Sequence, residues 1–274
     1  MSLSGDRPTA RPRAPLLSAV AADRLLRIGL PTLLIAIFLG LWQLSDTLFD
    51  IPVYMLPRPS DFVPQFWLSF PKLWHNTWPT AVVILGGFAI GTVVSIPLAY
   101  AIASSRMLEK GLYPALVILQ IAPKTIIAPL LIVWFGTGWM PQLALTTVMT
   151  FFPILVDSMT GFKAVDPRLF YIADSTGASR FETFRYIRLP AAMPYIFSGL
   201  KIGMVSAITG VMVVEYIASN AGLGYLTLWA SAHLDMPLMF AAILTTAFLG
   251  LVLNLVLTSV ELLLMPWLKR DHDS

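Results

Sequence analysis

Long apolar segments alternate with short polar ones along most of the chain. The six longest apolar blocks cover roughly residues 25–44, 81–103, 112–135, 140–159, 195–217 and 238–264. Each is close to the roughly 20 residues with which a helix crosses a hydrocarbon core about 30 Å thick. Because every backbone polar group in lipid needs a partner inside the protein, we expect these blocks to be helices. The pattern predicts an all-α integral membrane protein with about six transmembrane helices.

The composition supports this interpretation and sets the domain limits. Only 12% of the residues are charged, against about 25% in a soluble domain. We expect an N-terminal tail over 1–24, a transmembrane domain over 25–268 and a short C-terminal tail over 269–274. The chain has no cysteine and no HExxH pair among its three histidines. Disulfide and thiolate chemistry are therefore excluded, and a zinc enzyme is disfavoured.

Basic residues predict the orientation, because the loops of membrane proteins that face the cytoplasm carry an excess of lysine and arginine. An even number of spans places both termini on one side, and we expect that side to be cytoplasmic. The cytoplasmic segments then hold Arg7, Arg11, Arg13, Arg24, Arg27, Arg106, Lys110, Lys163, Arg168, Arg180, Arg185, Arg188, Lys269 and Arg270. The outer segments hold only Arg58 and Lys72.

The longest predicted inner loop, about residues 160–190, contains the capping and turn residues typical of two short helices. Asp166 suits an N-cap, and Pro167 suits the first helical position. Gly177 is a natural residue just past a helix end. Ser179 and Glu182 have capping-box spacing at the start of a second helix, which we expect to end before Pro190. From these residues alone, the loop could lie on the lipid surface or dock into a groove of another protein.

The same loop resembles the signature loop of the permease subunits of ATP-driven (ABC-type) bacterial importers. Their pattern is Glu-Ala-Ala, three residues, Gly, nine residues and Ile-x-Leu-Pro. Here Gly177 is followed by nine residues and then by Ile187-Arg188-Leu189-Pro190. The Glu-Ala-Ala positions fall on Tyr171, Ile172 and Ala173, so this chain lacks the family's glutamate.

Other segments are similar to the nitrate, sulfonate, taurine and pyrimidine-precursor branch of these permeases, and the resemblance covers roughly residues 40–268. They read Leu56-Pro57-Arg58-Pro59-Ser60, Pro123-Lys124 through Ala128-Pro129-Leu130, Trp134-Phe135-Gly136-Thr137-Gly138, and Glu215 followed by Gly222-Leu223-Gly224-Tyr225.

The resemblance implies a type I ABC importer permease fold in a bacterial cytoplasmic membrane, with a cytoplasmic coupling helix-turn-helix between spans four and five. It also implies three protein partners: a cytoplasmic ATPase dimer, a substrate-binding protein on the outer side, and a second permease, which we expect to be another copy of this chain. The residues expected to couple to the ATPase are Ala173, Asp174, Gly177, Ala178, Ser179, Phe181, Glu182, Ile187, Leu189 and Pro190. No nucleic acid is expected to bind.

The expected role is transport without an ATPase site. No GxxxxGK[ST] phosphate loop occurs in the chain, so ATP and Mg²⁺ are expected on the partner ATPase and no cofactor on this chain. A secondary transporter of a small organic solute is the main alternative. It would usually show internal repeats and interior charges, and no repeat is evident. A membrane-embedded enzyme would need clustered reactive side chains, and no such cluster stands out.

Two ionisable residues within apolar blocks are candidates for the translocation path. Lys124 lies about half-way along its block beside Pro123, where it could attract an anionic solute or pair with a carboxylate or free carbonyl groups. Glu215 lies near the outer end of the fifth block and could act in gating, form a pair or sit at the interface. Lys124 makes a small, anionic solute the favoured expectation.

Overall fold

The computed structural model describes residues 29–266, and every regular element in that range is a helix. The predicted tails and both ends of the predicted transmembrane domain lie outside these residues. The helices are α2 (Leu30–Gln43), α3 (Ser45–Phe49), α4 (Pro59–Leu68), α5 (Phe70–Ser104), α6 (Arg106–Ile121), α7 (Ala128–Phe135), α8 (Trp139–Lys163), α9 (Pro167–Ser175), α10 (Arg180–Thr183), α11 (Leu189–Ala218), α12 (Leu223–Ala232) and α13 (Met236–Leu264). A 3₁₀ turn, Lys124–Ile127, precedes α7, and a π-helical turn, Phe184–Arg188, joins α10 to α11.

Within residues 29–266, not every predicted apolar block forms a single straight span. Four helical stretches are long and apolar enough to cross a membrane: α5, α8, the run from α10 through α11, and α13. The block at 112–135 is a pair of helices bent by 82°, and it gives a fifth span if the pair counts as one. The described part of the first block is α2, with 14 residues, which is shorter than a helix needs to span the core.

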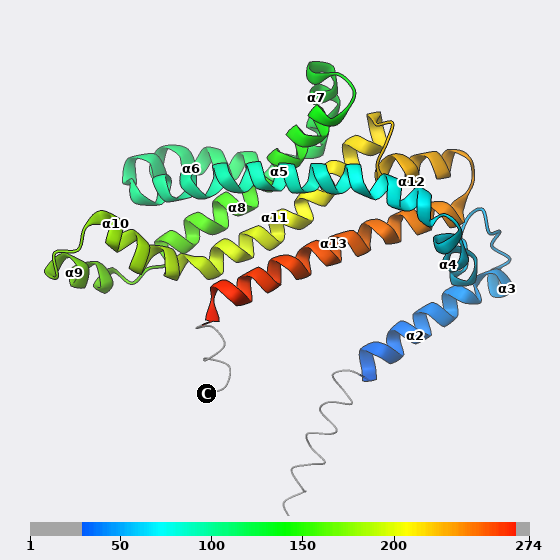
Figure 1. Ribbon diagram of the computed structural model, residues 1–274, viewed down its shortest axis with the longest axis horizontal. Helices are drawn as coiled ribbons and strands as arrows, with labels where there is room; N and C mark the ends of the chain where they lie inside the picture. The colour runs from blue at the N-terminus through cyan, green and yellow to red at the C-terminus, as the bar shows by residue number, and fades with distance from the viewer. Residues whose placement is uncertain (1–28, 267–274) are drawn as a thin grey trace, which may run out of the picture. The chain divides into compact units, whose positions relative to one another are not determined.

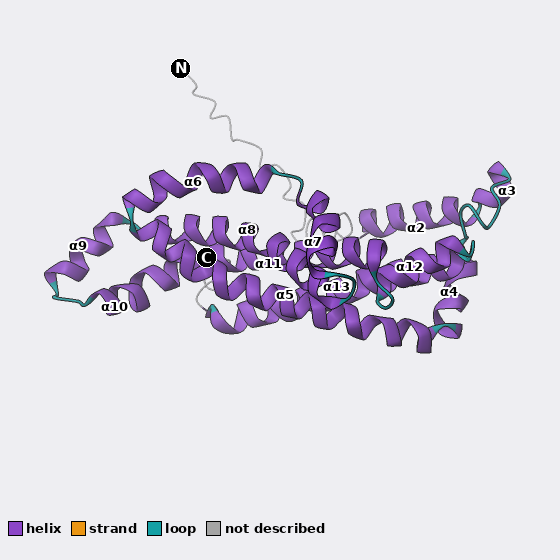
Figure 2. Ribbon diagram, turned by 90° about the horizontal axis from the view of Figure 1, so that it is seen from above, coloured by secondary structure: helices purple, strands orange, loops and turns teal. Residues whose placement is uncertain are grey.

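Proline chemistry explains the bend in the block at 112–135. Pro123 has no backbone N–H, and its ring clashes with the carbonyl of residue 119 in a continuing helix. α6 therefore ends at Ile121, and the chain resumes after Pro123 in a new direction (Figure 2). By contrast, Pro97, Pro114 and Pro153 lie inside helices, as expected for a membrane bundle.

Helical structure also extends beyond the apolar blocks, as α5 and α12 show. α5 begins at Phe70 rather than at 81, because its polar residues Asn76 and Thr80 are buried against the protein. α12 lies in a segment predicted to be an outer loop, and it buries Leu223, Leu226 and Ala230. Short amphipathic or buried helices of this kind carry no long apolar block, so hydropathy alone misses them.

Helix α8 lies at the centre of the bundle and packs most extensively on α11 and α5 (Figure 1). Glycines bring the α5 backbone close to α8. A Cβ added at Gly87 would lie 2.5 Å from Cγ2 of Thr146, and one at Gly91 would lie 3.0 Å from Cβ of Thr150. On the other side of α8, Gly199 and Gly203 of α11 approach Ile154 in the same way. Small residues therefore let three helices pack at close range.

Residues up to Asp61 form a unit separate from the bundle. Within it, the Trp42 indole donates to the carbonyl oxygen of Pro57 at 3.0 Å. The Gln43 side chain donates to the Ser60 hydroxyl at 2.9 Å and accepts from the Ser60 backbone N–H at 3.1 Å. These bonds hold the Leu-Pro-Arg-Pro-Ser segment against the end of α2.

Candidate functional site

The loop between α8 and α11 forms the helix-turn-helix predicted from its capping residues. The Asp166 side chain accepts from the backbone N–H of Arg168 at 2.9 Å and caps α9. After α9, Gly177 has φ +71°, a conformation that costs side-chain-bearing residues about 1–2 kcal/mol. The N–H of Ala178 donates to the Ala173 carbonyl at 3.0 Å, as in a Schellman motif. Gly177 therefore reverses the chain between the two helices.

The second helix begins with the predicted capping box. The backbone N–H of Glu182 donates to the Ser179 hydroxyl at 3.2 Å, and the Ser179 N–H donates to the Glu182 carboxylate at 2.7 Å. The prediction that this helix ends before Pro190 was wrong, since it continues into α11. The backbone N–H of Leu189 donates to the carbonyl of Phe184, five residues earlier. This wider π turn accommodates Pro190, which has no N–H and would crowd a regular helix.

The predicted ATPase-coupling residues occupy both exposed and packed positions on this loop. Ala173 is buried, and Phe181 is 68% exposed. Asp174, Gly177, Ser179 and Glu182 are also exposed, whereas Ala178, Ile187, Leu189 and Pro190 are half-buried. Tyr171 and Ile172, at the positions of the family's Glu-Ala pair, are exposed with Phe181. Tyr171, Ile172 and Phe181 thus form an exposed apolar surface, here called the tip of the loop. Exposed apolar surfaces of this kind are typical of interaction sites.

Aromatic contacts join the root of the loop, the segment around Phe184 where the loop meets α11, to the long helices α5 and α8. The ring centroid of Phe184 lies 4.7 Å from that of Tyr100 in α5 and 6.3 Å from that of Phe162 in α8. The Tyr100 and Phe162 centroids are 5.4 Å apart. Pairs in this range contribute about 0.5–1.5 kcal/mol beyond their burial. These rings connect the loop to both helices.

Lys124 lies at the break between α6 and α7. In a continuous α-helix, the backbone N–H of residue 124 would donate to the carbonyl of residue 120. Here Nζ of Lys124 donates to the Gln120 carbonyl at 2.6 Å, and it also lies 5.0 Å from the centroid of the Phe152 ring. The side chain thus satisfies a carbonyl group at the end of α6, one of the partners considered from the sequence.

A cavity of about 440 Å³ opens beside Lys124. Apart from Lys124 and Thr147 its lining is apolar: Val94, Leu119, Ala122, Ile127, Val148, Phe151 and Phe152. Aromatic walls with a few polar groups are typical of small-molecule sites. The cavity could hold an apolar body with one group that pairs with a cation.

Glu215 is 1% exposed and belongs to a closed polar cluster. Its carboxylate accepts from the Thr80 hydroxyl of α5 at 2.8 Å and from the backbone N–H of Gly224 at 2.8 Å. Close by, the Asn76 side chain accepts from the N–H of Gly222 at 3.0 Å. A buried carboxylate needs such donors, because an unpaired one costs several kcal/mol. The cluster fixes the turn between α11 and α12 onto α5.

Sequence reasoning did not identify Asn76 and Thr80 as partners of Glu215. The two residues lie four positions apart on α5, so they share a helix face. This spacing could have indicated a shared polar contact. However, the hydropathy pattern placed Asn76 and Thr80 in a loop before the predicted span at 81–103. In the same way, Lys201 forms an ion pair with Glu261 of α13, whose position near the end of the last block gave no indication of a partner.

Comparison with known proteins identifies the family. The family described as "Binding-protein-dependent transport system inner membrane component" matches residues 91–270. A riboflavin transport system permease protein of Chloroflexus aurantiacus is 36% identical over 88% of this chain and 90% of its own length. A formylaminopyrimidine transport permease protein of Halalkalibacterium halodurans is 29% identical over 88% and 96%.

A third relative is a putative aliphatic sulfonates transport permease protein of Escherichia coli, 29% identical over 90% of this chain and 95% of its own length. These names match the branch indicated by the sequence, and they support an ABC permease over a secondary transporter. The family is a transport component rather than a catalyst. Its description implies a binding protein as partner, and its membership of the ABC permeases implies an ATPase. The chain belongs to the binding-protein-dependent transport system inner membrane components and is the membrane-spanning permease subunit of an ABC transporter.

Proposed function

We propose that this chain forms half of the translocation path of an importer for a small solute, and that the loop from α9 to α10 docks into a cytoplasmic ATPase dimer. The observation that carries the proposal is the loop itself. Its tip presents exposed apolar residues, including Tyr171, Ile172 and Phe181, and its root packs on α5 and α8 through Phe184.

This arrangement supports a coupling mechanism. ATP binding would bring the two ATPase subunits together and draw the docked loops with them. Because the loop continues into α11 without a break, its displacement would act directly on that span. The bundle would then alternate between states open to either side, which requires that ATP favour one of them. ATP and Mg²⁺ would bind only to the ATPase, and this chain would hold no cofactor.

The ten coupling residues would have two roles in this mechanism. The exposed ones, Asp174, Gly177, Ser179, Phe181 and Glu182, would contact or shape the docking surface. The packed ones, Ala173, Ala178, Ile187, Leu189 and Pro190, would hold the loop in its conformation. Arg168, Arg180 and Arg185 on the same loop support a cytoplasmic position for it and for both termini, by the positive-inside rule.

The break at Pro123 supports a second copy of the chain as partner. Ala122, Pro123 and Thr125 are exposed in the single chain. Irregular backbone at membrane depth is tolerated only where protein or a water-filled cavity covers it. A homodimer with the two breaks facing the central path would satisfy this requirement.

The solute would pass Lys124. The adjacent cavity joins one cation to aromatic and aliphatic walls, which suits a compact solute with an apolar or planar body and an anionic or strongly polar acceptor group. A substrate-binding protein would deliver the solute to the end of the bundle that lies away from the coupling loop. The names of the relatives supply a test panel of riboflavin, formylaminopyrimidine and an aliphatic sulfonate.

Glu215 would contribute to the translocation path indirectly, because it holds the turn between α11 and α12 in place. That turn contributes Ser219 and Asn220 to a cavity of about 450 Å³, which Trp78, Trp139 and Gln142 also line. The Gln142 side chain donates to the Ser219 hydroxyl at 3.0 Å. The cavity lies at the end of α5 away from the coupling loop, where the solute would enter.

Co-purification with the cognate ATPase tests the docking proposal. Phe181→Ala should lower the recovered ATPase several-fold, because a large apolar contact is lost. Met107→Ala is the matched control. Met107 is also an exposed apolar residue, and it follows the C-terminal end of α5 but lies outside the loop. Equal recovery with both variants would contradict docking at the loop tip.

A further inference from the structure

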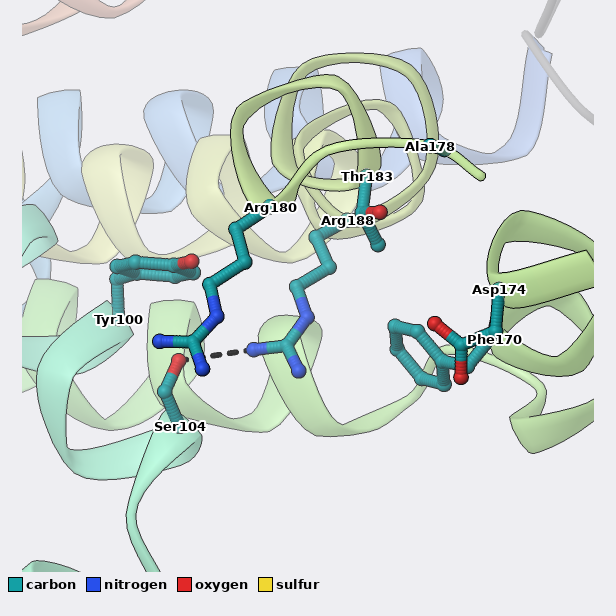
Figure 3. A pocket seen from close by; sticks show the side chains of 8 residues that line it. All are labelled: Tyr100, Ser104, Phe170, Asp174, Ala178, Arg180, Thr183 and Arg188. Atoms are coloured by element: carbon teal, nitrogen blue, oxygen red, sulfur yellow. Dashed lines mark hydrogen bonds between the residues drawn. The ribbon is translucent and has the colours of Figure 1, made fainter. Parts of the chain in front are cut away.

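Two arginine side chains share a cavity at the root of the coupling loop. The cavity has a volume of about 510 Å³, and its lining includes Tyr100, Ser104, Phe170, Asp174, Arg180 and Arg188. Figure 3 shows the guanidinium groups of Arg180 and Arg188 side by side, both directed toward Ser104, with Asp174 on the opposite wall. Within residues 29–266, neither guanidinium forms an ion pair with a carboxylate.

Arg188 is held in place by three neighbours. Its Nη1 donates to the Ser104 hydroxyl at 2.8 Å. Its guanidinium carbon lies 4.9 Å from the Phe170 ring centroid and 5.7 Å from that of Tyr100. An arginine has five N–H donors, and Ser104 takes only one of them among the described residues. A fixed guanidinium with free donors is pre-organised for an oxyanion.

Arg180, which is an exposed residue, adds a second positive charge to the cavity and so favours a bound anion. Two like charges that share a cavity disfavour each other unless an opposite charge lies between them. Asp174 lines the same cavity, but one carboxylate leaves a net positive charge there. A group with several acceptor oxygens, able to bond both guanidinium groups at once, would complete the arrangement. A phosphate group has that geometry.

The position of the cavity indicates the source of the phosphate. α5 ends at Ser104 and α11 begins at Leu189, so the cavity lies between the ends of two membrane-spanning helices, on the side of the coupling loop. Basic pockets between transmembrane helices on the cytoplasmic side bind anionic lipid headgroups.

We propose that the cavity between Arg180 and Arg188 is a binding site for the phosphate group of an anionic phospholipid. A bound phosphate would bridge the end of α5 at Ser104, α10 at Arg180 and the turn before α11 at Arg188. It would therefore hold the root of the loop to the bundle while leaving the exposed tip, including Phe181, free for a protein partner. The site is independent of the solute and of the direction of transport.

Native mass spectrometry of the purified full-length chain tests the site, with phosphatidylglycerol or phosphatidylcholine added to the detergent solution. The native chain should retain phosphatidylglycerol in preference to phosphatidylcholine. Arg180→Gln should weaken that retention by about fivefold or more, since it removes a charge-assisted hydrogen-bonding group. Arg185→Gln removes the same charge from an exposed residue outside the cavity and should leave retention unchanged.

Two further measurements separate the alternatives. Millimolar inorganic phosphate should not displace the bound lipid; displacement without any preference for phosphatidylglycerol would overturn the assignment to lipid in favour of a soluble phosphate. Ser104→Ala, which keeps both arginines, should weaken retention less than Arg180→Gln, and thermal unfolding should confirm that each variant is folded. Equal retention of phosphatidylglycerol by the native chain and by folded Arg180→Gln would overturn the proposal, whatever effect that variant has on ATPase binding.

Discussion

The carboxylate of Glu215 in α11 accepts a hydrogen bond of 2.8 Å from the hydroxyl of Thr80 in α5, 135 residues earlier in the chain. The same hydroxyl oxygen accepts from the backbone N–H of Leu223 at 2.9 Å. One polar contact thus links two spans to the first residue of α12. Glu215 is only 1% exposed, and an unpaired hydrogen-bond donor or acceptor at such a buried position lowers the stability of the fold.

Removal of this carboxylate should destabilise the protein. Glu215→Ala would leave the Gly224 N–H without its acceptor and open a cavity, with an expected loss of about 2–4 kcal/mol. Glu215→Gln keeps one acceptor oxygen and should lose less. Thermal unfolding in detergent checks the order native, Gln, Ala. An unchanged midpoint for Glu215→Ala would show that the cluster does not stabilise the bundle.

Gly222 should tolerate substitution less than another glycine of positive φ. Gly222 has φ +110° and Gly136 has φ +76°, so alanine is strained at both. A Cβ at Gly222 would also overlap the Glu215 carboxyl group, whereas one at Gly136 would meet no atom within 4 Å. Gly222→Ala should therefore cost more than Gly136→Ala, by about 1–3 kcal/mol. Equal unfolding midpoints would contradict the close packing at Glu215.

Lys124 should be needed for transport rather than for assembly. Lys124→Met keeps much of the side-chain length but removes the charge next to the cavity, and we expect uptake of the transported member of the solute panel to fall about tenfold or more. Lys110→Met, a matched change at an exposed lysine of α6, should transport normally. Normal uptake by Lys124→Met would remove this residue from the proposed path.

Phe184 should couple the loop to the bundle. Phe184→Ala deletes the ring between Tyr100 and Phe162, and it should cost about 2–4 kcal/mol of stability, since the site is only partly buried. The reconstituted complex should continue to hydrolyse ATP but should move less solute per ATP. A fully coupled variant would show that the aromatic cluster does not transmit the movement.

The local features of the coupling loop were predictable because single residues determine them. Asp166, Gly177 and the pair of Ser179 and Glu182 act on backbone groups within a few positions, and the structure has each of these contacts. The end of the second helix was not predictable in the same way. The general effect of Pro190 on a helix is opposed here by a π turn, which depends on packing around Phe184.

The long-range features were beyond the reach of hydropathy. The contact between Thr80 and Glu215 joins residues whose sequence positions carry no information about each other. The break after Ile121 falls within a continuous apolar block, in which proline is tolerated at Pro97 and Pro153 but not at Pro123. Whether a proline bends a span depends on whether neighbouring helices satisfy the freed carbonyl groups, and this is a property of the folded bundle.

Site-specific cross-linking tests docking at the loop tip most directly. The chain has no cysteine, so a benzophenone maleimide can be attached at one position only, in Phe181→Cys or in the control Met107→Cys. In membranes that contain the cognate ATPase, we expect an ATPase adduct from position 181 whose yield changes on addition of ATP and Mg²⁺, and little adduct from position 107. No ATPase adduct from position 181, or equal yields from both positions, would contradict this docking.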